Sequence, residues 1–526
     1  PLYGRDTYNG SFTRPTGAAA SNLYNLADFE LGLRAQYALS SVLVAHLRRN
    51  MHFAYIQDDW RATDKLTLNL GVRYEYATPY WEKDNILSNY DAATNSIVNA
   101  KAGSLADRAL VDPDRNNFGP RVGFAYTVAP ETVVHGGYGI SYAHFTRAGG
   151  GDLLPINGPQ VVNAVVNQTN PASATFIPAE QGYPAGLADP SQFNPLTANI
   201  TYIPRNFHSG RVQSWYLSVQ RQIARDLLVD VAYVANRADG LELFANYNQA
   251  LPNNAAGTIA LADRRPIPGF ADITYAFNGG KSRYKALQAK VEWRMSRDVT
   301  VLNSLTLSDT KDNGSQSLEN ANGNFPAPQD FRNLEADFGL SEYHQPYNNT
   351  TSFTWSLPFG RNAAGLTRAL IAGWELAGIN RINAGEPVTF TYSPGATFIV
   401  SGIAQDFRGA NNYRPNVTCD PLASDPTISG WFNRDCVVIP TDPSQPFGNA
   451  ARNSVRGPIF WQLDTALSKR FAFGASTAFE FRLEAFNLLN RTNFRAPNGS
   501  RSSGAFGTIT STYDPRQLQL GFKFLW

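Results

Sequence analysis

The chain is short of cysteine, of charged residues and of long apolar runs. Only 17% of its 526 residues are charged, below the about 25% of ordinary globular chains. The net charge of +2 gives no basis for a nucleic-acid partner. No window approaches the about 20 consecutive apolar residues of a transmembrane helix, since the nearest one, 38–47, is too short and is followed by two arginines. These features exclude a helical membrane protein, and we expect no nucleic-acid partner.

Motifs for cofactors, metals and catalysis are also missing. Residues 279–282 have the ending of a phosphate-binding loop, but Tyr275 stands where that loop needs its first glycine. The six histidines show no metal-ligand spacing. Residues 309–314 have the start of a calcium loop, but Lys311 takes a ligand position and Asn320 replaces the closing glutamate. We therefore expect no cofactor, no metal site and no enzymatic activity.

The sequence does contain a strong two-residue alternation of apolar and polar side chains. In 66–76 every second residue, from Leu66 to Tyr76, is apolar or aromatic, and the same pattern ends the chain in Phe522, Phe524 and Trp526. In a strand this alternation gives two unlike faces. Many such strands, joined alternately by tight turns and long loops, predict an all-β fold: a transmembrane antiparallel β-barrel with an oily outside and a wet inside. The mean hydropathy of −0.30 fits this prediction.

Loop lengths support a barrel more strongly than any single strand does. The predicted strands are 53–62, 66–80, 117–128, 133–146, 211–224, 227–241, 284–296, 299–309, 347–357, 372–383, 459–473, 477–493 and 516–526. Most hairpins turn at Asp or Gly, one of them at Gly474, Ala475 and Ser476. The connections between hairpins, 81–116, 147–210, 242–283, 310–346, 384–458 and 494–515, are long and polar. We expect about 13–14 strands, the additional one at 8–14, with short periplasmic turns and long extracellular loops.

Charged residues that alternate with apolar ones predict the wet side of the barrel. An Arg or Lys that faces lipid at the bilayer midplane costs about 2–4 kcal/mol, so these residues should face the lumen. They are Arg73, Glu75, Lys290, Glu292, Arg294, Glu480, Arg482 and Glu484. Their apolar neighbours, such as Val291, Phe353 and Phe481, should face lipid.

The two cysteines, Cys419 and Cys436, lie in the longest predicted loop. Two thiols this close in a polar loop of an exported protein favour a disulfide, and the alternative is two unrelated free thiols. In the chain-entropy model, closing a loop of this length stabilises by about 3 kcal/mol.

Several segments resemble the barrel of TonB-dependent receptors, especially the Oar-like (OmpA-related) branch. They are YIQDDW at 55–60 with LTLNLGVRYEY at 66–76, NFGPRVGFAY at 117–126, QSW at 213–215, FGNAARNSVRGP at 447–458 and FRLEAFNLLNRTNF at 481–494. The resemblance runs over nearly the whole chain. The final strand residues Phe522, Phe524 and Trp526 resemble the C-terminal signal that barrel-assembly machinery reads.

The resemblance implies a 22-stranded barrel with an N-terminal plug and a segment that TonB engages. The chain has fewer strands, and it opens at Pro1 without a recognisable signal peptide or plug. We therefore expect residues 1–526 to be the barrel portion of such a receptor, with the plug and N-terminal domains outside this chain. The implied partners are outer-membrane lipid, the TonB complex through the missing N-terminal part, the barrel-assembly machinery and an extracellular ligand.

The leading hypothesis is a non-enzymatic receptor and transporter of the bacterial outer membrane. Loops 147–210 and 384–458 are the expected ligand-contacting segments, and a siderophore, glycan, peptide or cobalamin all remain open as the ligand. The alternatives are a passive porin-like channel, a surface adhesion or assembly barrel, and a soluble β-propeller or carbohydrate-active enzyme.

Overall fold

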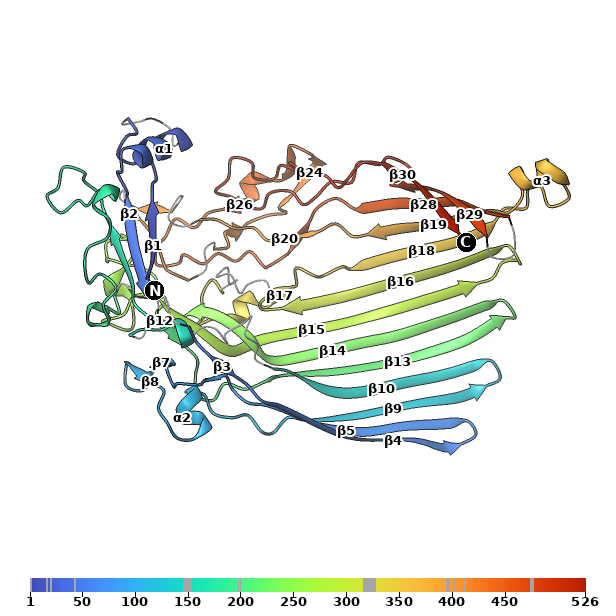
Figure 1. Cartoon of the computed structure of the whole chain (residues 1–526), viewed down its shortest axis with the longest axis horizontal. Helices are drawn as coiled ribbons and strands as arrows, with labels where there is room; N and C mark the ends of the chain where they lie inside the picture. The colour runs from blue at the N-terminus through green and yellow to red at the C-terminus, as the bar shows by residue number, and fades with distance from the viewer. Residues whose placement is uncertain are drawn as a thin grey trace.

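The computed structural model describes residues 2–15, 18, 21–41, 44–144, 154–159, 161–196, 198, 200–315, 328–393, 398–400, 403–409, 413–473 and 477–526. Its main feature is a 15-stranded sheet, which Figure 1 shows as long arrows lying side by side. Along the main path of this sheet each strand pairs antiparallel with the next one in the chain. These strands are β4 (Met51–Thr63), β5 (Leu66–Ala77), β9 (Phe118–Ala129), β10 (Thr132–Ala143), β13 (Gly210–Ala224), β14 (Leu227–Asn246), β15 (Ile273–Trp293), β16 (Val299–Asp312), β18 (Tyr347–Ser356), β19 (Trp374–Asn383), β28 (Phe460–Ala472), β29 (Ala478–Phe486) and β30 (Gln517–Leu525).

The two ends of the sheet differ in how the strands are joined. Figure 1 shows the tight hairpins of β4–β5, β9–β10, β13–β14 and β15–β16 at the right, with the C-terminus near that end. We call this the turn end; β18 and β19 are joined there by a longer link that contains helix α3 (Gly365–Ile371). The long connections and the N-terminus lie at the opposite end, the loop end (Figure 1). This is the predicted alternation of short turns and long loops.

Most smaller elements belong to the loop end. The short strands there include β1 (Leu2–Thr7), β2 (Gln36–Ser41), β3 (Leu47–Arg48), β6 (Trp81–Glu82), β7 (Ser88–Asp91), β8 (Ser96–Asn99), β11 (Asn163–Asn167), β12 (Ile200–Tyr202) and β17 (Gly339–Leu340). Later in the chain come β20 (Pro387–Val388), β21 (Ile399–Val400), β22 (Ile403–Ala404), β23 (Asn416–Val417), β24 (Leu422–Thr427), β25 (Gly430–Phe432), β26 (Val437–Val438) and β27 (Val455–Arg456). The helices are α1 (Asn22–Glu30), α2 (Leu105–Ala109) and the 3-10 turns η2 (Leu154–Ile156), η3 (Ala179–Gln181), η4 (Pro190–Gln192), η5 (Ala262–Arg264), η7 (Leu334–Asp337) and η8 (Arg434–Cys436). In the described part of the chain, no helix has the length and apolarity to cross a membrane.

The predicted strand at 8–14 is wrong. The strand β1 ends at Thr7, and a turn follows in which Gly10 has a φ of +72°. The Asp28 carboxylate accepts hydrogen bonds from the backbone N–H groups of Phe12 and Thr13 (3.5 and 3.0 Å), so these groups are not available to a sheet. The expected turn at 474–476 lies outside the described residues.

Of the strand ends that differ from the prediction, two differ most. β15 begins at Ile273 rather than at 284. Beyond a register shift between Asp239 and Leu241, the end of β14 continues to pair with the first part of β15. Residues 273–275 of β15 also pair with β12. β29 ends at Phe486 rather than at 493, because Asn487 adopts a left-handed φ of 51° and its side chain accepts from the backbone N–H of Arg491 (3.0 Å).

The register assigns the two faces of the sheet. Residues that are opposite one another in neighbouring strands lie on the same face of the sheet. By this rule one set of charged side chains lies on a single face, called here the polar face: Arg73, Glu75, Lys290, Glu292, Glu480, Arg482 and Glu484. Leu70, Val291, Phe353 and Phe481 lie on the other, apolar face. Lys469 is an exception on the apolar face; its Nζ donates to the Ala372 carbonyl at the turn end (2.6 Å), which lets a long side chain leave an apolar surface.

The two outermost strands have one neighbour each. Within the described residues, β4 pairs with β5 alone and β30 pairs with β29 alone. Within the described residues the sheet is therefore open along β4 and β30, and its hydrophobic clusters lie in the packed connections of the loop end.

Candidate functional site

The charged side chains of the polar face form short ladders along single strands. Arg482 lies between Glu480 and Glu484 on β29, with nitrogen–oxygen distances of 3.5 and 3.4 Å. Arg294, just beyond the end of β15, pairs with Glu292 at 3.4 Å. Lys290 is opposite Asp230 in the register of β14 and β15. These charges are partly exposed on one face of the sheet, and each exposed pair contributes only about 0–1 kcal/mol.

A more enclosed group lies at the loop end of the polar face. Arg73 Nε is 2.9 Å from Glu75 Oε1, and His144 Nε2 is 2.8 Å from the second oxygen of the same carboxylate. The other ring nitrogen of His144 lies 3.0 Å from the Ser209 hydroxyl, immediately before β13. Glu75, on β5, is only 6% exposed. His144 follows β10 and contacts both the Glu75 carboxylate and Ser209, so it connects β5 to the approach to β13.

The polar face also carries a hollow of about 500 Å³ over β4, β5, β9, β10 and β13. Four glycines of this face, Gly71, Gly123, Gly137 and Gly139, line it where side chains would otherwise fill the space. Tyr216 borders it opposite Gly137. The sequence analysis missed this hollow, although the recurrence of glycine at alternate positions of these strands was a usable signal.

The long connections pack into a loop cap, which is our name for the described parts of 81–116, 147–210, 242–283, 310–346, 384–458 and 494–515. One apolar cluster joins 81–116 and 147–210 to the end of β14, through Leu87, Leu110, Leu154, Ile203, Phe207 and Phe244. A second joins 384–458 to 494–515 through Val388, Phe390, Phe432, Val437, Ala450, Val455 and Phe506. The two segments expected to contact a ligand therefore lie in different packed groups.

Buried polar contacts connect the second group to its neighbours. Arg414 pairs with Asp337, and Arg452 Nη1 lies 2.8 Å from Asp312 Oδ1, which ties 384–458 to 310–346. Arg264 donates from Nη1 to the Leu251 carbonyl (2.8 Å) and from Nη2 to the Asp406 carbonyl (2.5 Å). The cap is thus a packed layer rather than a set of independent loops.

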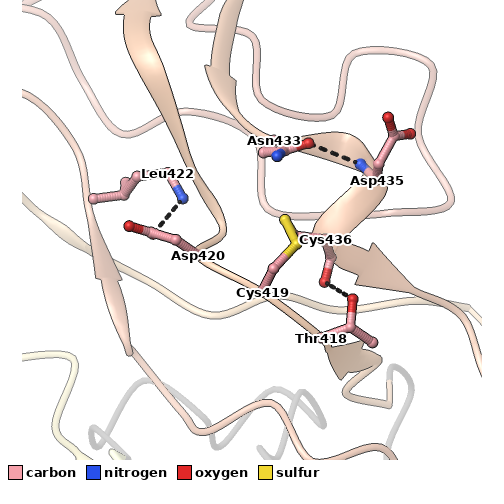
Figure 2. The surroundings of a disulfide bond; sticks show 7 residues. All are labelled: Thr418, Cys419, Asp420, Leu422, Asn433, Asp435 and Cys436. Carbon is pink, nitrogen blue, oxygen red and sulfur yellow. Dashed lines mark hydrogen bonds between the residues drawn. A yellow bond between two sulfur atoms is a disulfide. The ribbon is translucent and has the colours of Figure 1, made fainter.

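The structure joins Cys419 and Cys436 in a disulfide with a Cα–Cα distance of 5.0 Å. Figure 2 shows it beside Asp420, which accepts from the Leu422 N–H, and beside the carbonyl of Cys436, which accepts from the Thr418 hydroxyl. The strands β24 and β25 form the hairpin between the two cysteines, so the disulfide closes the base of that hairpin.

His344 and Tyr513 are among the titratable groups of the cap whose pKa values are shifted. His344 is 6% exposed, and burial together with the nearby Arg456 lowers the pKa of its imidazole. Tyr513 donates to Glu386 Oε1 (2.5 Å), and burial together with this carboxylate raises the pKa of Tyr513 to about 12. His344 accepts from the Thr310 N–H at 3.2 Å through Nδ1, so it holds the cap to the end of β16 only while that nitrogen is unprotonated.

The described residues contain no group of three or more His, Cys, Asp or Glu side chains that could hold a metal. The segment that resembles the end of a phosphate-binding loop lies inside β15, and residues 309–312 of the calcium-like segment lie inside β16. Both are extended backbone in a sheet ladder, which cannot wrap around a phosphate or a cation. At the end of the chain, Phe522 and Phe524 lie on the apolar face and are 65% and 54% exposed, and Trp526 is 89% exposed.

The comparison with protein-family models agrees with this geometry. A family model described as "Outer membrane beta barrel domain" matches residues 1–519. No curated protein sequence matches the chain. Among solved structures, the FrpB iron transporter from Neisseria meningitidis is similar with 11% identity and a TM-score of 0.42, over 99% of this chain and 51% of that one. The siderophore receptor PirA from Acinetobacter baumannii is similar with 10% identity and a TM-score of 0.43, over 93% of this chain and 46% of that one.

The chain thus spans about half the length of these two solved relatives. The family match covers nearly the whole sequence and agrees with the alternating faces and the loop lengths of the sheet. The chain belongs to the outer membrane beta barrel domain family, and its place is the bacterial outer membrane.

Proposed function

We propose that this chain is the barrel portion of a TonB-dependent, Oar-like receptor that takes up an extracellular ligand and catalyses no reaction. The observation that carries the proposal is the combination of one charged face, traced through the register, with a packed loop cap above it. A cap of this size serves recognition, and a charged wall serves passage of a hydrated solute.

The open edges of the sheet support a larger barrel than these strands can close. β4 and β30 present unpaired edges within the described chain, and an unpaired backbone group in hydrocarbon costs several kcal/mol. In the proposed receptor further strands meet these edges. A plug from outside residues 1–526 gates the lumen, and TonB engages a segment of that part.

Ligand capture is assigned to two segments of the cap. The described parts of 147–210 and 384–458 lie in separate packed groups, so they can approach a ligand from two sides. The disulfide between Cys419 and Cys436 holds the hairpin of the second segment in shape. The ionic ladders of the polar face then line the passage below.

Uptake by the natural full-length gene product tests the proposal. Cells with and without TonB would be given radiolabelled ferric siderophores, cobalamin, oligosaccharides and peptides. We expect at least one of these solutes to accumulate only when TonB is present. Equal accumulation in both strains, together with steady conductance in planar bilayers, would instead establish a passive porin-like channel.

A further inference from the structure

The apolar face changes character at the loop end of four neighbouring strands, β13 to β16. On β14 its side chains are Leu227, Val229, Val231, Tyr233 and Ala235, followed by Arg237. That apolar stretch matches the about 9–11 residues with which a barrel strand crosses the hydrocarbon layer. The next positions on this face belong to a set of cations called here the rim cluster: Arg211, Arg237, Arg283, Lys285 and Lys311.

The register puts these cations side by side. Arg237, Arg283 and Lys311 are opposite one another on β14, β15 and β16. Arg211 lies on β13 opposite Asp239, and Lys285 on β15 opposite Asp309. Figure 1 shows these four strands as direct neighbours in the middle of the sheet. The rim cluster is therefore one continuous surface and not a set of scattered charges.

Carboxylates balance only part of this charge. Asp239 is shared by Arg237 (2.6 Å) and Arg283 (3.1 Å), and Asp309 is shared by Lys285 (3.5 Å) and Lys311 (4.0 Å). Five cations and two carboxylates leave a net charge of +3. Lys281, on the same face, pairs with Glu335 (2.5 Å) and adds no net charge.

The cations are also accessible from outside the wall. The side chains of Arg237, Lys285 and Lys311 are 51%, 62% and 45% exposed, and Arg211 is exposed as well. Tyr142, which is opposite Arg211 on β10, lies on the same face. Tyrosines on a lipid-facing surface concentrate where hydrocarbon gives way to headgroups, so this ring indicates the same boundary.

We propose that the rim cluster binds the phosphate groups of the phosphorylated glycolipid that forms the outer leaflet. The family places the chain in the outer membrane, and the loop end is the extracellular end of such a barrel. An excess of cations beside hydrocarbon is unfavourable unless anions meet it. Arginine forks bind phosphate oxygens in pairs, and lysine stems reach along the apolar wall toward headgroups. This binding depends on the membrane location and is independent of TonB-driven transport.

Lipid retention by the natural full-length protein tests this proposal. The protein would be reconstituted in phosphatidylcholine vesicles doped with lipid A that carries both phosphates, or with the same lipid after phosphate removal. After detergent extraction, native mass spectrometry counts the glycolipid left on each protein. We expect the phosphorylated lipid to be retained at least tenfold better than the dephosphorylated one.

Two variants and a matched control separate the cluster from general charge. R237Q/R283Q/K311Q removes three cations from the rim cluster and should lower retention at least tenfold. K65Q/R225Q/R297Q removes three exposed cations from the turn end and should leave retention unchanged. D239N/D309N removes the carboxylates that compete with phosphate for the cations, and it should raise lipid retention. Because this variant predicts a gain, the proposal can still be tested if R237Q/R283Q/K311Q does not fold. Heat-modifiable mobility in gels reports the folded state of each.

Three results would overturn the proposal. They are equal retention by the wild type and R237Q/R283Q/K311Q, equal retention of phosphorylated and dephosphorylated lipid, and complete displacement by an equal concentration of inorganic phosphate. The last result would make the cluster a site for small free anions.

Discussion

Arg452 and Asp312, which are far apart in the sequence, form a nearly buried ion pair at the loop end of β16. The Nη1–Oδ1 distance is 2.8 Å, and the two side chains are 12% and 9% exposed. Arg452 also donates from Nη2 to the Ser315 hydroxyl (2.9 Å). The pair links the connection between β19 and β28 to β16, and neither β19 nor β28 pairs with β16 in the sheet.

We expect R452M to loosen this contact, because removing one partner leaves a buried charge without compensation at a cost of about 3–5 kcal/mol. The measurement is amide hydrogen exchange of peptides around Asp312 and around Asn453, which should become faster. R408M, which removes an exposed pair with Asp406, is the control and should change local exchange little. Unchanged protection around Asp312 in R452M would contradict the importance of this pair.

The assignment of the two faces predicts the environment of spin labels. Labels at Val291, Phe353 and Phe481 should collide mainly with oxygen dissolved in lipid, because these positions lie on the apolar face. Labels at Glu292, Thr354 and Arg482, one residue along each strand, should collide with a water-soluble nickel quencher. The adjacent positions control for depth, and a reversed pattern would refute the assignment.

Removing the disulfide should weaken one hairpin and leave the sheet intact. C419S/C436S loses a link across a sequence separation of 17, which corresponds to about 3 kcal/mol in the chain-entropy model. We expect faster proteolysis within β24 and β25, measured by mass spectrometry of the fragments. The far-ultraviolet circular dichroism should stay the same, and the reduced wild type should behave like the variant.

His344 predicts a pH dependence of the cap. Its folded pKa is lowered below the ordinary value of about 6.5, so the native state binds this proton less readily than the unfolded chain does. The stability that the neutral ring contributes is therefore present above about pH 6.5 and is lost as the pH falls toward the lowered pKa. Hydrogen exchange at the C2 position of this imidazole should give the lowered pKa directly.

R456Q provides the matched test, because Arg456 is one of the causes of the shift. We expect the pKa of His344 to move back toward its ordinary value in this variant. The Thr310 N–H, which donates to the ring, should lose protection at higher pH than in the wild type. A pKa at or above the ordinary value in the wild type would contradict the prediction.

The end of the chain predicts an assembly phenotype. F522S/F524S/W526S removes two aromatic side chains from the apolar face of β30 and one from the residue that follows this strand, and we expect several-fold less folded protein in the outer-membrane fraction. Q517A/Q519A/K523A changes the polar face of the same strand and should assemble normally. Heat-modifiable mobility distinguishes folded from unfolded protein, and equal assembly of both variants would show that the aromatic residues are dispensable.

The sequence predicted most of the wall of the barrel, because its strands are governed by local rules. Alternation located strands such as β4 and β5, and Asp or Gly at the turns located their hairpins. It failed at 8–14, where the tertiary contact of Asp28 with the backbone decides the conformation. It also failed at the start of β15, where pairing continues outside the membrane span and no change in composition marks the boundary.

The candidate site was less accessible to prediction. The polar face followed from alternation, but the contacts in the cap join residues that are far apart, such as Arg414 and Asp337. No periodicity encodes such pairs, because they depend on how whole connections fold over one another. The glycines of the hollow were visible, yet only the register shows that Gly71, Gly123, Gly137 and Gly139 share a face.

Ion pairs and hydrogen bonds of the cap link strands that are not neighbours in the sheet, so the loop end is more strongly cross-linked than the turn end. β16 and β28 are separated in the sheet by β18 and β19, yet Arg452 and Arg456 carry contacts from the segment before β28 to Asp312 and to the His344 carbonyl. At the opposite end, tight hairpins join β4 to β5, β9 to β10, β13 to β14 and β15 to β16, and the described bridges between hairpins there are few, such as Arg361 with Asp298. The spacing of these strands is therefore fixed from outside the membrane, and any widening of the wall should begin on the periplasmic side.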